Sequence, residues 1–236
     1  STQSSSFLSK EEREWIRQHG VIQIGYLNHD GGISSIDPST GKLTGVITDY
    51  VDIAKDCLQG QTLKFELKGY DTRSELLQAL HDGKIDLIFH ANQNPYFAET
   101  NGFSLSDTLL TLNMAAITAK DSFDENKENI VAVEKDNFAL KAYLSHNYPQ
   151  WKIVEYETSK AAVKAMQKEE ADCIVSNSVT VSNYLKHNKR PSVFLTNEAD
   201  VSFAVQQGEP VLLSILNKTL TSMPITQFSG AVVSYN

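Results

Sequence analysis

Several features that mark common functional classes are missing from this 236-residue sequence. Its two cysteines, Cys57 and Cys173, lie far apart in apolar segments, so we predict two separate buried thiols and neither a disulfide nor a metal site. No apolar run approaches the ~18 residues that cross a bilayer. The polar opening STQSSS lacks the regions of a signal peptide, so any export signal or anchor is expected outside this sequence.

Excess basic charge and catalytic motifs are absent as well. The net charge of −8 argues against nucleic acid as a partner, because nucleic acid is bound by basic surfaces. The sequence has no Gly-x-Ser-x-Gly, no phosphate-binding loop and no His-Glu-x-x-His, and its six histidines are scattered. We therefore expect no catalytic residue, no metal and no cofactor. An enzyme would need a proton donor, and the only visible candidates are His29, Asp30 and His90.

What the sequence does contain is an alternation of strand-like and helix-like segments. In the first hundred residues, strands are predicted at 21–26, 62–67 and 85–91, and helices at 46–58 and 72–84, which indicates a parallel α/β sheet. The segment 27–42 is rich in Gly, Ser, Asp and Pro and is predicted to be a loop. After an apolar run at 108–120 the alternation restarts, with further elements expected at these ranges: strands 129–134, 152–157 and 171–176, helices 138–147, 159–170 and 179–187, an apolar run at 201–206 and a last helix at 210–223.

A helix–turn–strand pattern occurs twice. Residues 74–92 and 160–178 superpose without a gap, which matches Ala79 with Ala165 and Asp86 with Asp172. Charge is also divided unevenly: residues 115–198 hold 11 basic and 12 acidic side chains, whereas the remaining residues hold 10 and 17. Both observations indicate two lobes of similar topology.

The order and spacing of several segments resemble the family 3 bacterial solute-binding proteins, and the resemblance covers about Ser9 to Met223. LSKEEREWIRQHGVIQIGY resembles the entry to the extracellular Venus flytrap domains of sensor kinases. Four later segments are also similar to the family: LTGVITDYVDIAKD, GKIDLIF, FSLSD and SFAVQQGEPVLLSILNKTL. In the first of them, the similarity rests on Gly45 and Asp49. The resemblance implies an α/β, two-lobed periplasmic-binding-protein-like (type II) fold. Each lobe would be a mainly parallel sheet flanked by helices, with two crossover strands as a hinge. Lobe 1 would comprise residues 1–110 and 203–236, and lobe 2 residues 111–202.

The resemblance also implies a function in binding. We expect an extracellular or periplasmic domain that senses a small solute in the interlobe cleft, anchored to the membrane within a longer signalling receptor, and we leave open a dimer of that receptor. The SKEEREWI entry and the end at SGAVVSYN favour such a sensor. A stand-alone receptor of an ABC importer is the alternative, and a cleft enzyme of the dehydratase type is a lower alternative.

Candidate ligand-binding residues come from the rule that open α/β sheets bind ligands beyond the carboxyl ends of their strands. Polar side chains with a few aromatics at these positions suit a small polar or aromatic solute. The candidates are Tyr26, Asn28, His29, Asp30, His90, Asn92, Gln93, Asn94 and Phe97 in lobe 1, and Asp136, Asn137, Ser176, Asn177 and Ser178 in lobe 2.

Two of these candidates depart from the family. Amino-acid binders of the family carry an arginine six residues before a Phe-Ser pair, where it holds the ligand carboxylate, and this chain has Phe97 there. They also carry an acidic residue that pairs with the ligand ammonium, and this chain has Asn177 there. Leaving two desolvated charges unpaired would cost on the order of 3–5 kcal/mol, so a free α-amino acid is disfavoured. Three alternatives remain, in this order of preference: a neutral or aromatic solute stacked on Phe97 or Tyr96, a different anion near Asn137, or no ligand at all.

Overall fold

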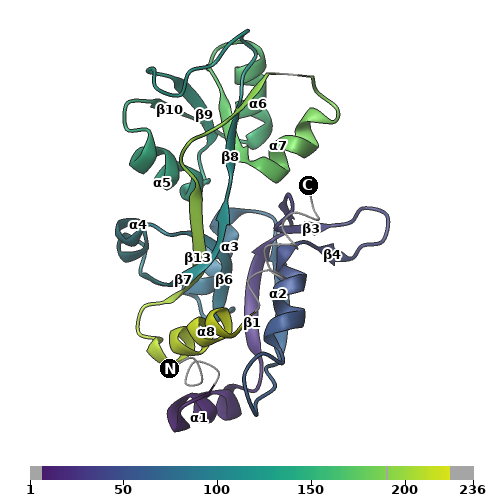
Figure 1. Cartoon of the computed structure of the whole chain (residues 1–236), viewed down its shortest axis with the longest axis vertical. Coiled ribbons are helices and arrows are strands. Elements are labelled where there is room, and N and C mark those ends of the chain that lie inside the picture. The colour runs from purple at the N-terminus through teal and green to yellow at the C-terminus, as the bar shows by residue number, and fades with distance from the viewer. Residues whose placement is uncertain (1–6, 190, 224–236) are drawn as a thin grey trace. The chain divides into compact units, whose positions relative to one another are not determined.

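Figure 1 shows the computed structural model of the chain, which describes residues 7–189 and 191–223, with the side chains of Pro95 and Phe97 left out. The chain divides into two compact units. Unit 1 runs up to Leu110 and resumes at Val201, and unit 2 runs from Thr111 to Asp200. The chain therefore leaves unit 1 within strand β7 (Phe103–Leu112) and returns within strand β13 (Ala199–Gln206).

Unit 1 is built on a five-stranded sheet in the order β5-β1-β6-β13-β7. Strand β1 pairs in parallel with both β5 and β6, whereas β13 runs antiparallel to β6. The other elements of this unit have these bounds: α1 (Lys10–His19), β1 (Ile22–Leu27), β2 (His29–Asp30), β3 (Ser34–Ile36), β4 (Leu43–Thr44), α2 (Val46–Ala54), β5 (Phe65–Tyr70), α3 (Arg73–His81), β6 (Leu87–Asn92), α4 (Pro95–Thr100) and α8 (Pro210–Ser222).

Both faces of this sheet carry buried side chains. Ile88 belongs to a cluster with Leu80 of α3 and Phe103 of β7. The next residue, Phe89, lies 5.5 Å from Phe203 between ring centroids, and Tyr50 of α2 lies 4.9 Å from Phe203. Because neighbouring residues of a strand point to opposite faces, the two clusters fill the two sides of the sheet.

Unit 2 has a mixed sheet arrangement. Strand β9 pairs in parallel with β10, and a parallel bridge between Val131 and Cys173 brings β9 beside the segment that leads into β11. Strand β8 lies antiparallel between β11 and β12. The elements of this unit are β8 (Met114–Ile117), β9 (Ile130–Glu134), α5 (Phe138–Asn147), β10 (Lys152–Tyr156), α6 (Ser159–Gln167), β11 (Ile174–Asn177), α7 (Ser178–Leu185) and β12 (Ser192–Phe194).

The α/β fold class is confirmed, but the sheets are more mixed than the expected mainly parallel ones. Antiparallel pairing enters unit 1 through the returning strand β13 and unit 2 through the entering strand β8. Each of these two strands directly continues the segment in which the chain crosses from one unit to the other. They are not preceded by the helical crossover that parallel pairing of successive strands requires.

The predicted internal repeat is present in detail. Helices α3 and α6 span matching residues, and each begins after a threonine that accepts a hydrogen bond from the third residue on, Thr72 and Thr158. Asp86 accepts a hydrogen bond from the backbone of Gln23 at 2.7 Å, and Asp172 accepts one from Ile130 at 2.6 Å. Each aspartate thereby ties the start of its own strand segment to a neighbouring parallel strand.

Other sequence-based expectations were wrong in part. Segment 27–42 is not only loop, because it contains β2 and β3, which form a small antiparallel sheet with β4 directly after it. Helix α2 ends at Ala54, before the predicted end at 58, and the chain continues in turns. Helix α4 and strand β12 were not predicted.

Cys173 is buried and Cys57 partly buried, and both are free thiols. Among the described residues, no helix is long and apolar enough to span a membrane.

Candidate ligand-binding site

The carboxyl ends of β1, β5 and β6 meet at one edge of the unit 1 sheet because these strands run parallel. The chain leaves β1 through Asn28 and leaves β5 through Asp71. The side-chain amide of Asn28 donates to the Asp71 carboxylate at 2.8 Å, which joins the two strand ends. This edge therefore carries a hydrogen bond between two polar side chains.

Asp30 and His90 form a hydrogen-bonded pair at this edge. The His90 Nε2 lies 2.9 Å from the Asp30 Oδ2, and the two side chains are 13% and 16% exposed. Burial of Asp30 raises its pKa, but the hydrogen bond from His90 and the electrostatic interactions with His90 and Arg73 outweigh this and hold the pKa below its usual value. The ionised carboxylate can only accept, so His90 Nε2 donates. The His90 Nδ1 is buried and has no hydrogen-bond partner in the described part of the chain.

The remaining candidates of unit 1 differ in accessibility. Tyr26 is buried, and burial raises its pKa. His29 is exposed. Gln93 accepts a hydrogen bond from Thr108 at 3.1 Å, and Asn92 pairs with Val201 in the sheet.

The loop after β6 carries the last two candidates and an aromatic neighbour. Asn94 precedes α4, and its carbonyl accepts from the Ala98 backbone at 3.0 Å. Phe97 lies on α4, but its side chain is outside the described part of the structure. Its neighbour Tyr96 is 79% exposed. Among the described side chains of this helix, Tyr96 therefore offers an accessible aromatic ring.

Unit 2 presents two helix starts at the carboxyl ends of neighbouring strands. Asn137 comes after β9, and its side chain accepts from Leu140 N at 3.2 Å at the start of α5. Asn177 ends β11, and its Oδ1 accepts from Thr180 N at 2.9 Å at the start of α7. Asn177 is 8% exposed.

The other three candidates of unit 2 flank these helix starts. Asp136, Ser176 and Ser178 are each half-buried. The Ser178 backbone N–H donates to Asn113 O at 2.8 Å. The five residues of this unit therefore gather at one edge, where two helix N-termini supply positive potential and one carboxylate opposes it.

Arg73 is a polar residue of the unit 1 edge that the sequence-based prediction missed. It opens α3 directly after the end of β5, and its charge acts on Asp30. The prediction used the ends of β1 and β6 and passed over the end of β5, although the rule of carboxyl ends applies equally to that strand. The chain thus has a guanidinium at this edge, at a different position from the family arginine.

Comparison with known proteins points to periplasmic domains. No family model matches the chain. The virulence sensor protein BvgS of Bordetella pertussis is 24% identical over 236 residues, which cover 95% of this chain and 18% of that protein. The sensor protein EvgS of Escherichia coli K12 is 24% identical over 228 residues, covering 92% of this chain and 18% of that protein. The chain thus spans less than a fifth of these sensor proteins.

Solved structures show the same pattern. The periplasmic VFT2 domain of Bordetella pertussis BvgS superposes with a TM-score of 0.79 at 22% identity, over 97% of this chain and 98% of that domain. The solute receptor for L-cysteine of Neisseria gonorrhoeae gives a TM-score of 0.67 at 21% identity, over 94% and 92% of the two chains. The chain therefore has the two-lobed, type II periplasmic-binding fold of the Venus flytrap kind that its sequence resembles.

Proposed function

We propose that this chain is the solute-sensing, periplasmic domain of a membrane-anchored bacterial signalling receptor. The carrying observation is the match to the BvgS periplasmic domain over nearly the full length of both chains. The alignments to the BvgS and EvgS sensor proteins over 92% or more of this chain support the same assignment. Since the chain spans 18% of those sensors, the membrane anchor and the output module belong to other parts of the receptor.

A stand-alone importer receptor is the second candidate. It is favoured by the similarity to a probable histidine-binding protein of Neisseria gonorrhoeae, which is 22% identical over 72% of this chain and 67% of that protein. The two functions share the solute site and differ in whether the domain is joined to a membrane anchor and an output module.

A catalytic role is the weaker proposal. A structure similar to this chain is an ancestral amino acid-binding protein described as a precursor of cyclohexadienyl dehydratase, with a TM-score of 0.70. The pair that an enzyme would use is Asp30–His90, but one ring nitrogen of His90 is bound to Asp30 and the other is buried. A proton donor must reach its substrate, so this geometry favours a binding or structural role for the pair.

The proposed solute contacts are the residues at the carboxyl ends of the strands in each unit. On unit 2, the hydrogen bonding of Asn177 limits which groups of a solute it can bind. Its Oδ1 already accepts from the backbone of α7, so the side chain offers chiefly its Nδ2 donor to a solute. A donor recognises a carbonyl or another acceptor and cannot pair with an ammonium group. The Asn177 donor, together with Phe97 in place of the family arginine, supports a neutral or aromatic solute.

A substitution at Asn177 tests the proposal cleanly only if it keeps the helix cap. Asn177→Ala removes the cap and is expected to cost about 1 kcal/mol of stability, in contrast to a purely ligand-contacting residue. Asn177→Asp keeps a capping oxygen and replaces the donor by a carboxylate. We expect Asn177→Asp to lose the neutral solute, while its melting temperature without ligand stays within about 2 °C of wild type.

Calorimetric titration of the purified chain supplies the readout. Asn183→Asp is the matched control, because Asn183 lies on the same helix, is exposed and undergoes the same change of charge. Phe97→Ala is the corresponding variant on unit 1 and is also expected to abolish binding. A variant at Asn177 or Phe97 that binds the solute as wild type does would show that the proposed contacts are wrong.

A further inference from the structure

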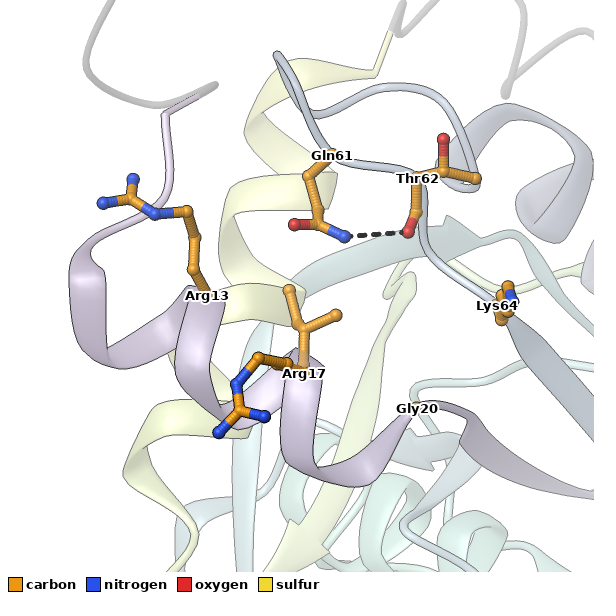
Figure 2. A pocket seen from close by; sticks show the side chains of 7 residues that line it. Arg13, Arg17, Gly20, Gln61, Thr62 and Lys64 are labelled. Atoms are coloured by element: carbon orange, nitrogen blue, oxygen red, sulfur yellow. Dashed lines mark hydrogen bonds between the residues drawn. The ribbon is translucent and has the colours of Figure 1, made fainter.

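The two ends of the parallel strands in unit 1 differ in which polar groups remain available. At the amino ends, beside α1, lies the hollow that Figure 2 shows. Its arginines are held by local partners. Arg17 donates from Nε and Nη2 to the Glu14 carboxylate, and Arg13 donates to the Leu8 carbonyl. Figure 2 shows Arg13 pointing away from Lys64, so the cations that line this hollow do not converge.

At the carboxyl ends, hydrogen bonds assign the orientation of the Asn28 side chain. The Asn28 backbone N–H donates to the Tyr70 carbonyl at 2.9 Å, and its carbonyl accepts from Ile36 N at 3.2 Å. The side-chain Nδ2 donates to the Asp71 carboxylate at 2.8 Å. Because an amide carries its donor and its acceptor on opposite sides, the Asn28 Oδ1 faces away from Asp71.

The Asn28 amide lies over Gly69 of β5. In the parallel register Tyr26 of β1 is paired with Gly69. A Cβ added to Gly69 would overlap with Asn28 Oδ1, and it would lie 2.9 Å from the Tyr26 hydroxyl oxygen and 3.0 Å from Asn28 Cγ. The polar ends of Asn28 and Tyr26 therefore both reach the point above β5 that glycine leaves open.

Backbone conformation does not account for the glycine at this position. Gly69 does not have a positive φ, so an L residue could adopt its conformation. Glycine also weakens the interior of a strand and often marks a close approach of other groups. The atoms that an added Cβ would meet belong to the Asn28 and Tyr26 side chains. The close approach of these two side chains thus explains the glycine.

Neither of the two oxygens is used by the fold. Among the described residues, Asn28 Oδ1 and the Tyr26 hydroxyl have no hydrogen-bond partner. Burial raises the pKa of Tyr26, so its hydroxyl keeps its proton and can donate. Asn28 is half-buried, so its amide oxygen stays within reach of a solute. One acceptor and one donor therefore lie near a common point.

We propose that Asn28 and Tyr26 bind a carboxamide group of the solute, and that Gly69 is the positioning residue for the Asn28 amide. A carboxamide carries an N–H donor beside a carbonyl acceptor, which match the Asn28 Oδ1 and the Tyr26 hydroxyl. The group is uncharged, so its binding leaves no desolvated charge unpaired. Under the proposed solute-sensing function, on which this specificity rests, the neutral or aromatic solute is thus an aromatic carboxamide.

Calorimetric titration of the full chain with benzamide and N,N-dimethylbenzamide tests this specificity, because the second compound keeps the ring and the carbonyl but lacks an N–H. We expect wild type to bind benzamide about tenfold more tightly than the dimethyl compound. Gly69→Ala displaces the Asn28 amide and not the strand, since Oδ1 is the end of a side chain. This variant should bind the two amides equally within about twofold, and its melting temperature without ligand should stay within about 2 °C of wild type or rise.

Tyr26→Phe is a second variant that removes only the hydroxyl. We expect it to weaken benzamide binding by about fivefold. Tyr70→Phe is the matched control, because Tyr70 lies in the same sheet and packs against the hydrophobic cluster around Leu80. That control should bind benzamide as wild type does.

Three results would overturn the specificity: equal binding of both amides by wild type, an unchanged preference in Gly69→Ala, or binding of neither amide. In the third case, binding of a different neutral solute would leave the sensing function standing. Failure of the sensing function itself would instead appear as binding of no solute at all.

Discussion

At the scale of single residues, Glu12 is the charged side chain with the most complete set of partners in the described part of α1. It is 4% exposed and accepts from the Ser9 backbone at 2.7 Å and from Ser214 at 2.7 Å, and it pairs with Lys218. Ser9 accepts in turn from Glu12 N, which completes a capping box at the start of α1. One carboxylate thus starts α1 and fastens it to α8, and Figure 1 shows these two helices side by side.

The pKa of Glu12 gives this attachment a pH dependence. Burial raises the pKa, but the hydrogen bonds from Lys218, Ser9 and Ser214 outweigh it and hold the pKa below its usual value. A lowered pKa in the folded state stabilises the fold above the unfolded pKa of about 4.3, and that contribution is lost as the pH falls through the folded value.

We therefore predict that Glu12→Gln lowers the free energy of unfolding by about 1–3 kcal/mol at pH 7, because Lys218 loses its ionised partner. The difference between wild type and variant should shrink below about pH 4. Urea unfolding at pH 7 and at about pH 3.5 measures both values. Glu11→Gln serves as the control, since Glu11 is the exposed neighbour in the same turn. An equal cost for the two variants at pH 7 would contradict the role of Glu12.

At the scale of elements, the repeated helix–turn–strand unit allows two turns of the same backbone geometry to be compared for their effect on stability. After α3 the chain turns through Gly83 at φ 74°, and after α6 it turns through Glu169 at φ 61°. The backbone contacts agree as well: Lys84 N donates to Ala79 O, and Glu170 N donates to Ala165 O, both at 2.9 Å. At the left-handed position itself, one turn has a glycine and the other a glutamate. An L residue with a side chain is strained there, whereas glycine is not.

We predict that Glu169→Gly leaves the stability unchanged or raises it by up to about 1 kcal/mol, and that Gly83→Ala lowers it by about 1 kcal/mol. Apart from Gly83 and its two chain neighbours, no described residue has a heavy atom within 4 Å of the position that a Cβ on Gly83 would occupy, so the cost of Gly83→Ala is conformational and not steric. Thermal unfolding of both variants and of wild type measures the two changes in stability. A marked loss of stability in Glu169→Gly would show that the Glu169 side chain compensates for its backbone strain.

At the scale of the whole molecule, the elements with strong periodicity were predictable and the shortest strands were not. The continuous apolar run at 85–91 predicts buried β6, and the apolar spacing at 159–170 predicts α6. Strand β12 is three residues long and Phe194 in it is 73% exposed, so it depends on pairing with β8 for its conformation. The small sheet of β2, β3 and β4 likewise consists of two- and three-residue strands that only tertiary pairing defines.

The candidate site shows the same division. Positions at the ends of predicted strands, such as Asn28 and Asn177, could be proposed from the sequence. The contact between Asp30 and His90 joins residues 60 apart and depends on two strands lying side by side. The role of Asn177 as a helix cap depends on the backbone conformation of the first turn, which the family resemblance does not report. Sequence patterns therefore locate the edges, and three-dimensional contacts determine which atoms remain available to a solute.

Thermal unfolding of the purified chain with a panel of small solutes shows directly whether it binds a neutral or aromatic solute. The panel comprises α-amino acids, sugars, nucleobases, aromatic acids and oligopeptides. A solute at about 100 times its dissociation constant adds about 2.7 kcal/mol, which shifts the melting temperature by several degrees. We predict such a shift with a neutral or aromatic solute, and its loss in Asn177→Asp. A shift with a simple α-amino acid would contradict the proposed solute class, and no shift with any member of the panel would contradict solute binding itself.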